Sequence, residues 1–368
     1  MPSTLQQEKP GIGIQKQAPQ PLNNFTVLRL ILASLVIVAH AASLSDGNTH
    51  REIFHMLGSQ LTAGEFAVES FFVVSGYLIL QSWSSRPRLG AFLMKRVLRI
   101  FPGFVAAYLI SALLVGWLGG GANYFSELLT PDRISESLIR LVALIYPDTP
   151  PVFSGSHEPM VNGAMWSITY EFRCYLLIPV LAALGLYSRR LVLTIAWVAI
   201  VLGTGISSAA HLRHPLALGI LRFVPFFLAG CCAYLYRDSI RWNRALGAVS
   251  IVASVISMNS LVATRFVLPI AGSYAILWLA FSEWSPLRHF SLANDISYGV
   301  YLYGWPTQKL LLWYFPSLPL GVQIFLTLGA SVALGWMSWI LIEKPCLSWK
   351  RTFVTATGRR DNILHTAG

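Results

Sequence analysis

The sequence predicts an all-α, polytopic membrane protein, a bundle of about ten transmembrane helices with both termini in the cytosol. Three observations carry this prediction. Apolar residues make up 55% of the 368 residues and charged residues only 12%, and the mean hydropathy of +0.58 is beyond the range of a soluble domain with a polar surface. The apolar residues fall into long uninterrupted runs. Clusters of Lys and Arg separate these runs and set their orientation.

Ten segments of roughly 18–22 residues are long enough to cross about 30 Å of hydrocarbon. Their predicted limits are 25–44, 64–83, 100–118, 166–186, 191–209, 218–236, 245–261, 265–282, 293–313 and 320–342. We therefore expect one transmembrane domain over 25–345. A disordered cytosolic tail, rich in Gln and Pro, precedes it at 1–24, and a second cytosolic tail follows at 346–368. The long external link at about 119–162 is a candidate to be ordered over the mouth of a site.

The basic residues sit in short clusters between the apolar runs, and most of these clusters fall inside when the N-terminus is cytosolic. They form no single stripe, so topology explains the net charge of +11 better than a nucleic-acid partner does. Membrane lipids are the expected surroundings. The four cysteines show no CxxC spacing and no matching His cluster, so we expect no disulfide framework, no metal site and no permanently bound cofactor.

The first segment carries a cation and an imidazole on one helical face. In "RLILASLVIVAH", the step from Arg29 to His40 returns to within about 20° of the starting azimuth and rises roughly 16 Å. Arg29 lies near the cytosolic end, where it either snorkels to the headgroups or faces a cavity. His40 lies deeper, where contact with lipid is costly, and this position predicts a polar cavity.

Carboxylates in two other segments are predicted at a similar depth. "GEFAVESFFVVSGYLIL" places Glu65 and Glu69 one turn apart near the external side, with Ser75 near the middle. "NGAMWSITYEFRCYLLIP" places Glu171 near the external side as well. Glu65 either lies at the interface or lines a shared cavity, and Glu171, with Arg173, either pairs with neighbours to hold the bundle together or lines that cavity. Ionisable residues on three helices at one depth favour the cavity.

The third segment is preceded by two arginines on one helical face. "MKRVLRIFPGF" places Arg96 and Arg99 three residues apart at the cytosolic surface, at the level of Arg29. They are either determinants of topology or a phosphate site, since guanidinium groups bind phosphate oxygens through two hydrogen bonds.

Taken together, these patterns resemble the acyltransferase 3 family of integral membrane acyltransferases over about residues 23–345. The family's markers occur in order as Arg-x10-His, "ESFFVVSGYLI", "KRVLRIFP", "NGAMWSITYEFRCYLLIP", "ISYGVYLYGWP" and "EKP" at 343–345. Each motif alone is common, whereas six in this order are specific. Many members have a His where this chain has Gly304, so we assign no catalytic role to that position.

The resemblance implies transfer of an acyl group, most often acetyl, to a hydroxyl of a carbohydrate or lipid-linked glycan. It also implies a multi-pass protein of the bacterial inner membrane that uses cytosolic acyl-CoA as the donor substrate. Acyl-CoA is polyanionic, so Arg29, Arg96 and Arg99 are the predicted donor-binding residues.

In the predicted mechanism, His40 is the general base that takes the proton of the acceptor hydroxyl. Glu69 orients the His40 ring, and Glu171 is a second candidate for that role or for binding the sugar. A covalent acyl-His intermediate agrees equally well with the sequence. The residues expected to line the cavity are Ser75, Trp166 and Tyr301.

A proton-coupled secondary transporter of a small anion or an acyl-sugar is the alternative prediction. Arg29, His40 and Glu69 would then form its ion pathway. The two predictions differ in the role of the cytosolic arginine pair, because only an acyltransferase needs it to bind coenzyme A. A non-catalytic scaffold leaves His40 unexplained and is the least favoured.

Overall fold

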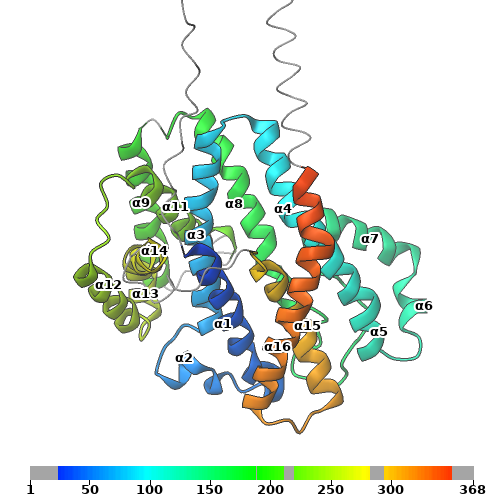
Figure 1. Ribbon diagram of the computed structural model, residues 1–368. Coiled ribbons are helices and arrows are strands. Elements are labelled where there is room, and N and C mark those ends of the chain that lie inside the picture. The colour runs from blue at the N-terminus through cyan, green and yellow to red at the C-terminus, as the bar shows by residue number, and fades with distance from the viewer. Residues whose placement is uncertain (1–23, 188, 211–218, 282–293, 350–368) are drawn as a thin grey trace, which may run out of the picture.

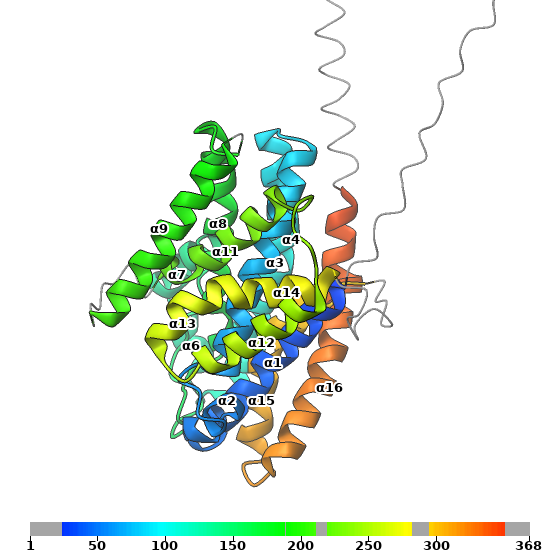
Figure 2. The same cartoon turned by 90° about the vertical axis from the view of Figure 1, so that its left-hand side faces the viewer.

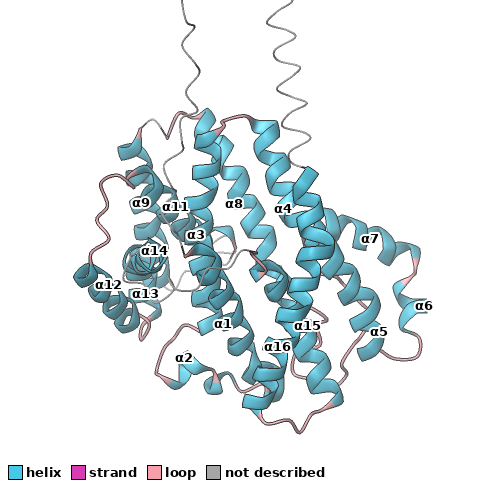
Figure 3. Ribbon diagram, viewed as in Figure 1, coloured by secondary structure: helices cyan, strands magenta, loops and turns pink. Residues whose placement is uncertain are grey.

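The computed structural model describes residues 24–187, 189–210, 219–281 and 294–349, and these ranges fold into helices joined by links (Figure 3). Within them, a single isolated bridge between Gly120 and Val152 is the only β-pairing. The all-α prediction is confirmed for the described chain. Nearly all of the two predicted tails, 1–24 and 346–368, lies outside the described residues.

Within the described residues, ten helical stretches form the body of the protein, and each overlaps one of the predicted segments. They are α1 (Phe25–Asp46), α3 (Ala63–Ser85), α4 (Leu89–Leu109) with η2 (Ile110–Val115) and α5 (Gly116–Gly119), α8 (Trp166–Ala183), α9 (Arg190–Ala209), α11 (Ile220–Leu235), α12 (Arg244–Ser257), α13 (Leu261–Val267) with η4 (Leu268–Gly272) and α14 (Ser273–Phe281), α15 (Ser297–Tyr314), and α16 (Leu320–Ser338) with η6 (Trp339–Glu343). The short elements in the links are η1 (Thr49–Arg51), α2 (Ile53–Met56), α6 (Tyr124–Leu128), α7 (Pro131–Val142) and η3 (Gly163–Met165).

Six of these stretches are long and apolar enough to cross a membrane: Phe25–Asp46, Ala63–Ser85, Leu89–Gly119, Arg190–Ala209, Leu261–Phe281 and Leu320–Trp349. This is the architecture of a multi-pass membrane protein. The other predicted segments form shorter or more polar helices, namely α8, α11, α12 and α15. The count of ten spans and the cytosolic location of the termini stay predictions.

Helix α3 runs along the bundle, and the points where neighbouring helices finish and begin mark the two ends of the bundle (Figure 1). At the α3–α4 end, uppermost in Figure 1, α3 finishes and α4 begins. At the α15–α16 end, lowermost in Figure 1, α15 finishes and α16 begins. The α3–α4 end is the one predicted to face the cytosol. The stretch from α13 to α14 runs across the other helices, since it is seen end-on in Figure 1 and lengthwise in Figure 2.

Two glycines allow α3 and α11 to pack with their backbones in contact. A Cβ atom added to Gly76 would lie 1.9 Å from the carbonyl oxygen of Phe227, and one added to Gly230 would lie 2.1 Å from that of Val73. No side chain fits at either position. Such pairs of small residues are a common way for membrane helices to approach closely. The Gly in the "SG" motif therefore fixes α3 at the centre of the bundle.

The link before α8 turns into the bundle instead of stopping at its surface. Asn162 is 1% exposed, and its Nδ2 donates to Ser111 Oγ at 3.1 Å and to the carbonyl oxygen of Leu302 at 2.9 Å. The η3 turn that follows is also buried. As a result α8 begins inside the protein, a position that hydropathy alone does not indicate.

The rest of the long link, 119–162, is ordered beside the bundle. It contains α6 and α7, and its buried side chains form a small second core together with Val115 of η2. That core is made of Val115, Tyr124, Leu128, Val152, Phe153 and Val161. The buried amino group of Lys309 on α15 donates to Ser156 Oγ at 2.8 Å, which ties the link to the body of the protein.

Candidate active site

Two cavities inside the bundle share two wall residues, Val68 of α3 and Tyr301 of α15. The smaller, about 40 Å³, is called the Arg29 cavity and is lined by Arg29, Val68, Phe71, Phe72, Ser167, Ile168, Glu171, Ser297, Tyr298 and Tyr301. The larger, about 150 Å³, is called the His40 cavity and is lined by Val36, Ala39, His40, Ser43, Thr49, Glu52, Thr62, Gly64, Glu65, Val68, Trp166 and Tyr301. Arg29 and His40 thus face one region from one helix, as predicted, and Val68 and Tyr301 lie between the two cavities.

His40 contacts an indole whose position is set by the long link. The rings of His40 and Trp305 meet edge to face, with their centroids 4.8 Å apart and an interplanar angle of 73°. Trp305 Nε1 in turn donates to the carbonyl oxygen of Met160 at 3.2 Å. No side chain or backbone group of the described chain is hydrogen-bonded to the His40 imidazole. Both ring nitrogens are therefore available to a bound molecule.

Glu171 lies beside Ser75 and not at the external side. Ser75 Oγ donates to Glu171 Oε1 at 3.1 Å, and the Tyr175 hydroxyl donates to the same oxygen. Ser75 is ten residues farther along α3 than Glu65, a rise of roughly 15 Å. The predicted depth of Glu171 is therefore wrong, because the buried turn before α8 displaces the whole helix toward the α3–α4 end.

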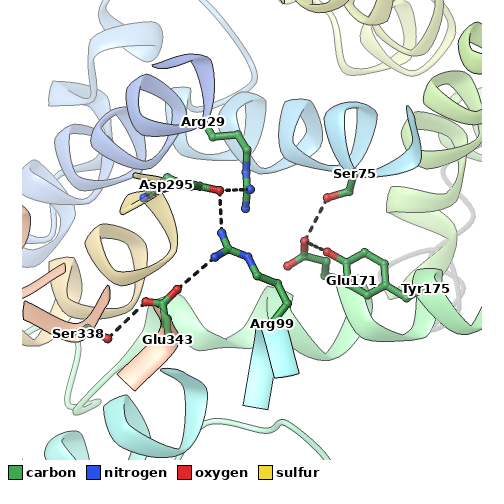
Figure 4. Close-up of polar contacts among 9 residues, drawn as sticks. Arg29, Ser75, Arg99, Glu171, Tyr175, Asp295, Ser338 and Glu343 are labelled. Carbon is green, nitrogen blue, oxygen red and sulfur yellow. Dashed lines mark hydrogen bonds and ion pairs between the residues drawn. The ribbon is translucent and has the colours of Figure 1, made fainter. Parts of the chain in front are cut away.

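Two of the predicted donor-binding arginines converge on one carboxylate (Figure 4). Asp295 Oδ2 accepts from Arg29 Nη1 and, at 2.7 Å, from Arg99 Nη2. Arg99 Nη1 also pairs with Glu343 Oε2 at 3.2 Å, and Ser338 Oγ donates to the other oxygen of Glu343 at 3.4 Å. This network joins α1, α4, the turn before α15, α16 and η6, and its charged side chains are largely buried, with Glu343 only 1% exposed.

Arg96 has different surroundings from Arg99. Its Nη2 donates to Ser82 Oγ at 3.3 Å, and its guanidinium lies over the rings of Phe92 and Tyr175. The buried Nε has no acceptor, and no carboxylate of the described chain pairs with this side chain. Of the three arginines predicted to bind the donor, Arg96 is therefore the one whose charge is least compensated.

Glu69 contacts arginines of α11 and α13 and lines neither cavity. Its Oε1 accepts from Arg222 Nε at 3.1 Å and from Arg265 Nη1 at 3.3 Å. Arg222 Nη2 also pairs with Glu65 Oε1 at 2.9 Å. Val68 precedes Glu69 by one residue, a turn of about 100°, so Val68 faces the cavities while Glu69 faces away. The role predicted for Glu69 in orienting His40 stays a prediction.

Comparison with known proteins places this arrangement in a family. Residues 22–341 match the acyltransferase 3 family, described as an acyltransferase domain. The chain belongs to that family. It is an O-acyltransferase, and the family expected from the motifs is confirmed.

Three relatives of this acyltransferase are similar in sequence. An O-acetyl transferase of Shigella phage Sf6 is 29% identical over 345 residues, covering 89% of this chain and 96% of the relative. Nodulation protein 10 of Rhizobium leguminosarum bv. viciae is 26% identical over 379 residues, covering 90% and 95%. Acyltransferase MdmB of Streptomyces mycarofaciens is 27% identical over 168 residues, covering 43% and 38%. No solved structure matches the chain.

The structure of the acyltransferase brings together most of the residues predicted from its sequence. Trp166 and Tyr301 line the His40 cavity as expected. Ser75 lines neither cavity but donates to Glu171, which does line one. The roles assigned to all of these residues stay predictions.

Four residues of the acyltransferase site were missed by the sequence analysis. Asp295 pairs with Arg29 and Arg99, Glu343 pairs with Arg99, and Arg222 and Arg265 pair with Glu69. Glu343 opens the "EKP" motif and Asp295 lies two residues before "SYG", so their places beside motifs were an available signal. Arg222 and Arg265 had no such signal, because their partner is on another helix.

Proposed function

We propose that the protein transfers an acyl group from acyl-CoA, bound from the α3–α4 end, to a hydroxyl group of a glycan bound near the α15–α16 end. The observation that carries this proposal is the pair of cavities meeting at Val68 and Tyr301. One contains a guanidinium and the other an imidazole, so an anionic donor and a hydroxyl acceptor have separate sites with a common wall. The relative named O-acetyl transferase supports acetyl as the group. The bacterial inner membrane is the proposed location.

On the donor side, the arginines suit a chain of phosphates. Arg96 has an Nε without an acceptor, and Arg99 and Arg29 lie deeper, around Asp295. From Ser82, which contacts Arg96, to Val68 is fourteen residues of α3, a rise of roughly 21 Å. An extended pantetheine arm spans a distance of this order. Phosphates held at Arg96 would therefore allow the thioester to reach the boundary between the cavities.

On the acceptor side, the walls of the His40 cavity suit a sugar. They carry hydroxyls from Ser43, Thr49 and Thr62, the carboxylate of Glu65, and the indole of Trp166. Hydroxyls and carboxylates exchange hydrogen bonds with sugar hydroxyls, and an indole provides a flat apolar face against a ring.

The reaction needs His40 first to accept a proton and then to release one. His40 takes the proton of the acceptor hydroxyl while that oxygen attacks the thioester carbonyl carbon. The carbon–sulfur bond then breaks, and the His40 imidazolium returns the proton to the leaving thiolate of coenzyme A. A covalent acyl-His intermediate uses the same geometry in two steps. Catalysis by a positioned base accounts for about 10²–10⁴ in rate.

The two carboxylates predicted as catalytic take positioning roles in this proposal. Glu171, held by Ser75 and Tyr175, fixes α8 against α3 and faces the donor cavity. Glu69 fixes α3 against Arg222 and Arg265, and so places Val68 and Glu65 relative to His40.

The experiment that tests the proposal follows free thiol release from acetyl-CoA by the purified protein in nanodiscs, with and without a panel of bacterial glycans. We expect release to require both a glycan and His40, with His40→Ala as the negative control. Failure of every glycan, together with failure of acetyl-CoA to bind, would overturn the proposal. The family assignment already argues against the alternative of a secondary transporter.

A further inference from the structure

An apolar cleft of about 580 Å³ opens at the α3–α4 end, away from both cavities. We call it the Trp83 cleft. Its walls are the end of α3, the start of α4 and the end of α8, which lie together at the top of Figure 1. The lining residues are Trp83, Pro87, Leu89, Pro179, Ala182, Ala183, Gly185 and Tyr187. The cleft thus combines two aromatic rings with two prolines, a surface suited to a flat, weakly polar ring system.

Four arginines adjoin the lining residues of the Trp83 cleft in the chain, and we call them the rim arginines. Arg86 and Arg88 flank Pro87, and Arg189 and Arg190 follow shortly after Tyr187, all four of them exposed. Residues 80–96 and 179–190 contain no Asp or Glu. Topology alone explains basic residues at a cytosolic surface, but it does not explain an aromatic cleft between them. An aromatic cleft adjoined by arginines matches a ligand that joins a base to phosphates.

Arg96 connects the cleft with the Arg29 cavity. It donates to Ser82, the neighbour of Trp83 in the chain, and both Arg96 and Trp83 contact the ring of Phe92. On its other side Arg96 lies over the ring of Tyr175, whose hydroxyl donates to Glu171 in the wall of the Arg29 cavity. Arg96 thus links the wall of the cleft, through Phe92, to the wall of the Arg29 cavity, through Tyr175.

We infer that the Trp83 cleft binds the adenosine 3′-phosphate end of the acyl-CoA donor, an inference that rests on the proposed function. The adenine ring stacks against Trp83 or Tyr187, the 3′-phosphate meets the rim arginines, and the diphosphate lies at Arg96. The remaining arm points toward Val68.

The axial spacing of the two walls agrees with this placement. Trp83 lies eight residues beyond Ser75 on α3, and Pro179 lies eight residues beyond Glu171 on α8. Each step is a rise of roughly 12 Å. Since Ser75 and Glu171 are hydrogen-bonded, the cleft stands about 12 Å above that bond along both helices. A nucleotide bound there would be well separated from the reacting thioester, which is the arrangement a long donor requires.

The test compares donors that keep or lack the nucleotide. For Trp83→Ala, we expect the KM for acetyl-CoA to rise about tenfold, the scale of losing one aromatic partner of a base, with kcat unchanged. The kcat/KM for S-acetyl-pantetheine, which has no nucleotide, should stay within about twofold of wild type. Arg86→Gln should weaken the binding of acetyl-CoA but not the binding of its 3′-dephospho form. Ala183→Trp, which fills the cleft, should act like Trp83→Ala and guards against a folding defect of the latter.

The matched control is Trp336→Ala, which removes an exposed indole of α16 outside the cleft and both cavities. This variant should show wild-type kinetics with both donors. Equal losses for acetyl-CoA and S-acetyl-pantetheine in Trp83→Ala and in Ala183→Trp would overturn the inference, as would unchanged kinetics in both variants.

Binding of adenosine 3′,5′-bisphosphate, measured by calorimetry on the purified protein, separates this inference from the proposed function. Turnover of acetyl-CoA without any binding or competition by the bisphosphate would refute the nucleotide site in the cleft and leave the proposed function intact. The cleft would then be assigned to lipid headgroups instead. Binding that depends on Trp83, in a protein that turns over no donor with any glycan of the panel, would support the nucleotide site and leave the transfer reaction without support.

Discussion

Val68 and Tyr301 each line both the Arg29 cavity and the His40 cavity, so the two cavities meet at this pair. Tyr301 is held in place, because its hydroxyl lies 2.7 Å from Ser167 Oγ and donates to the carbonyl oxygen of Ala164 at 2.5 Å. Val68 is 5% exposed and has only a small side chain. In the proposed function, the acyl group of the donor reaches this boundary, and Val68 is the smaller and more easily varied member of the pair.

Val68→Ala is expected to widen the boundary and admit longer acyl groups. The kcat/KM for butyryl-CoA relative to acetyl-CoA should rise about tenfold, the scale of a methylene-sized change in a pocket. Steady-state kinetics with the two donors measures the ratio. Val198→Ala, on an exposed surface of α9, is the matched control. An unchanged ratio in Val68→Ala would show that the acyl group does not reach this boundary.

His40→Ala is expected to lower kcat by about 10²–10⁴, because it removes the proposed base without removing the donor site. Binding of acetyl-CoA should persist, and the melting temperature should stay close to that of wild type. The control is His50→Ala, which alters an exposed imidazole in η1. Retention of more than a tenth of the activity by His40→Ala would reject the role of a base.

Substitutions of Arg96 and Arg99 are expected to have different effects. Arg99→Gln leaves Glu343, which is 1% exposed, without its cationic partner, and breaking a buried pair costs about 3–5 kcal/mol. We therefore expect a lower melting temperature. Arg96→Gln loses no carboxylate partner, so it should raise the KM for acetyl-CoA while the protein stays folded. An unaltered KM in Arg96→Gln would leave that residue as a determinant of topology only.

Glu69→Gln is expected to destabilise the bundle more than it slows the folded enzyme. The substitution leaves Arg222 and Arg265, both largely buried, facing a neutral amide, at a cost of several kcal/mol, about 3 by analogy with other buried pairs. Thermal unfolding and kcat should be measured on the same preparation, with Arg222→Gln expected to reproduce the loss. A fall in kcat as large as that of His40→Ala, at an unchanged melting temperature, would instead favour the direct role predicted from the sequence.

Gly76→Ala is expected to prevent folding, because its Cβ would lie 1.9 Å from a backbone oxygen of α11, and no rotamer change relieves a clash with backbone. Gly230→Ala should behave alike. Gly203→Ala is the matched control, since a Cβ at this α9 position meets nothing within 4 Å. The yield of monodisperse protein in detergent reports the outcome. Wild-type yield of Gly76→Ala would show that α3 and α11 are not packed this closely.

Much of the fold follows from local patterns in the sequence. Each of the ten apolar runs contains a helix, because backbone groups in lipid must be satisfied within the segment itself. The limits of α4 were less accessible. Its helix begins at Leu89, well before the predicted 100, since helical geometry continues through the polar turns that carry Arg96 and Arg99, where hydropathy gives no signal.

Most members of the candidate site were predicted, but four charged residues of the site and all of its ion pairs were not. Arg29 and His40 share a face through the helical period alone, which is why their relation was readable from one segment. The partners of Glu69 come from α11 and α13, and those of Arg99 come from the turn before α15 and from η6. No pattern within one segment encodes which distant cation meets which carboxylate.

The sequence by itself therefore determined the membrane class, the helices and the family, because hydropathy, helical period and motif order are properties of neighbouring residues. Only the tertiary structure decided that Glu171 sits with Ser75, that Glu69 faces two arginines, and that two cavities meet at Val68 and Tyr301. The physical reason is that a buried turn before α8 and two glycines between α3 and α11 set the relative heights of the helices. Those heights arise from contacts between segments far apart in the chain.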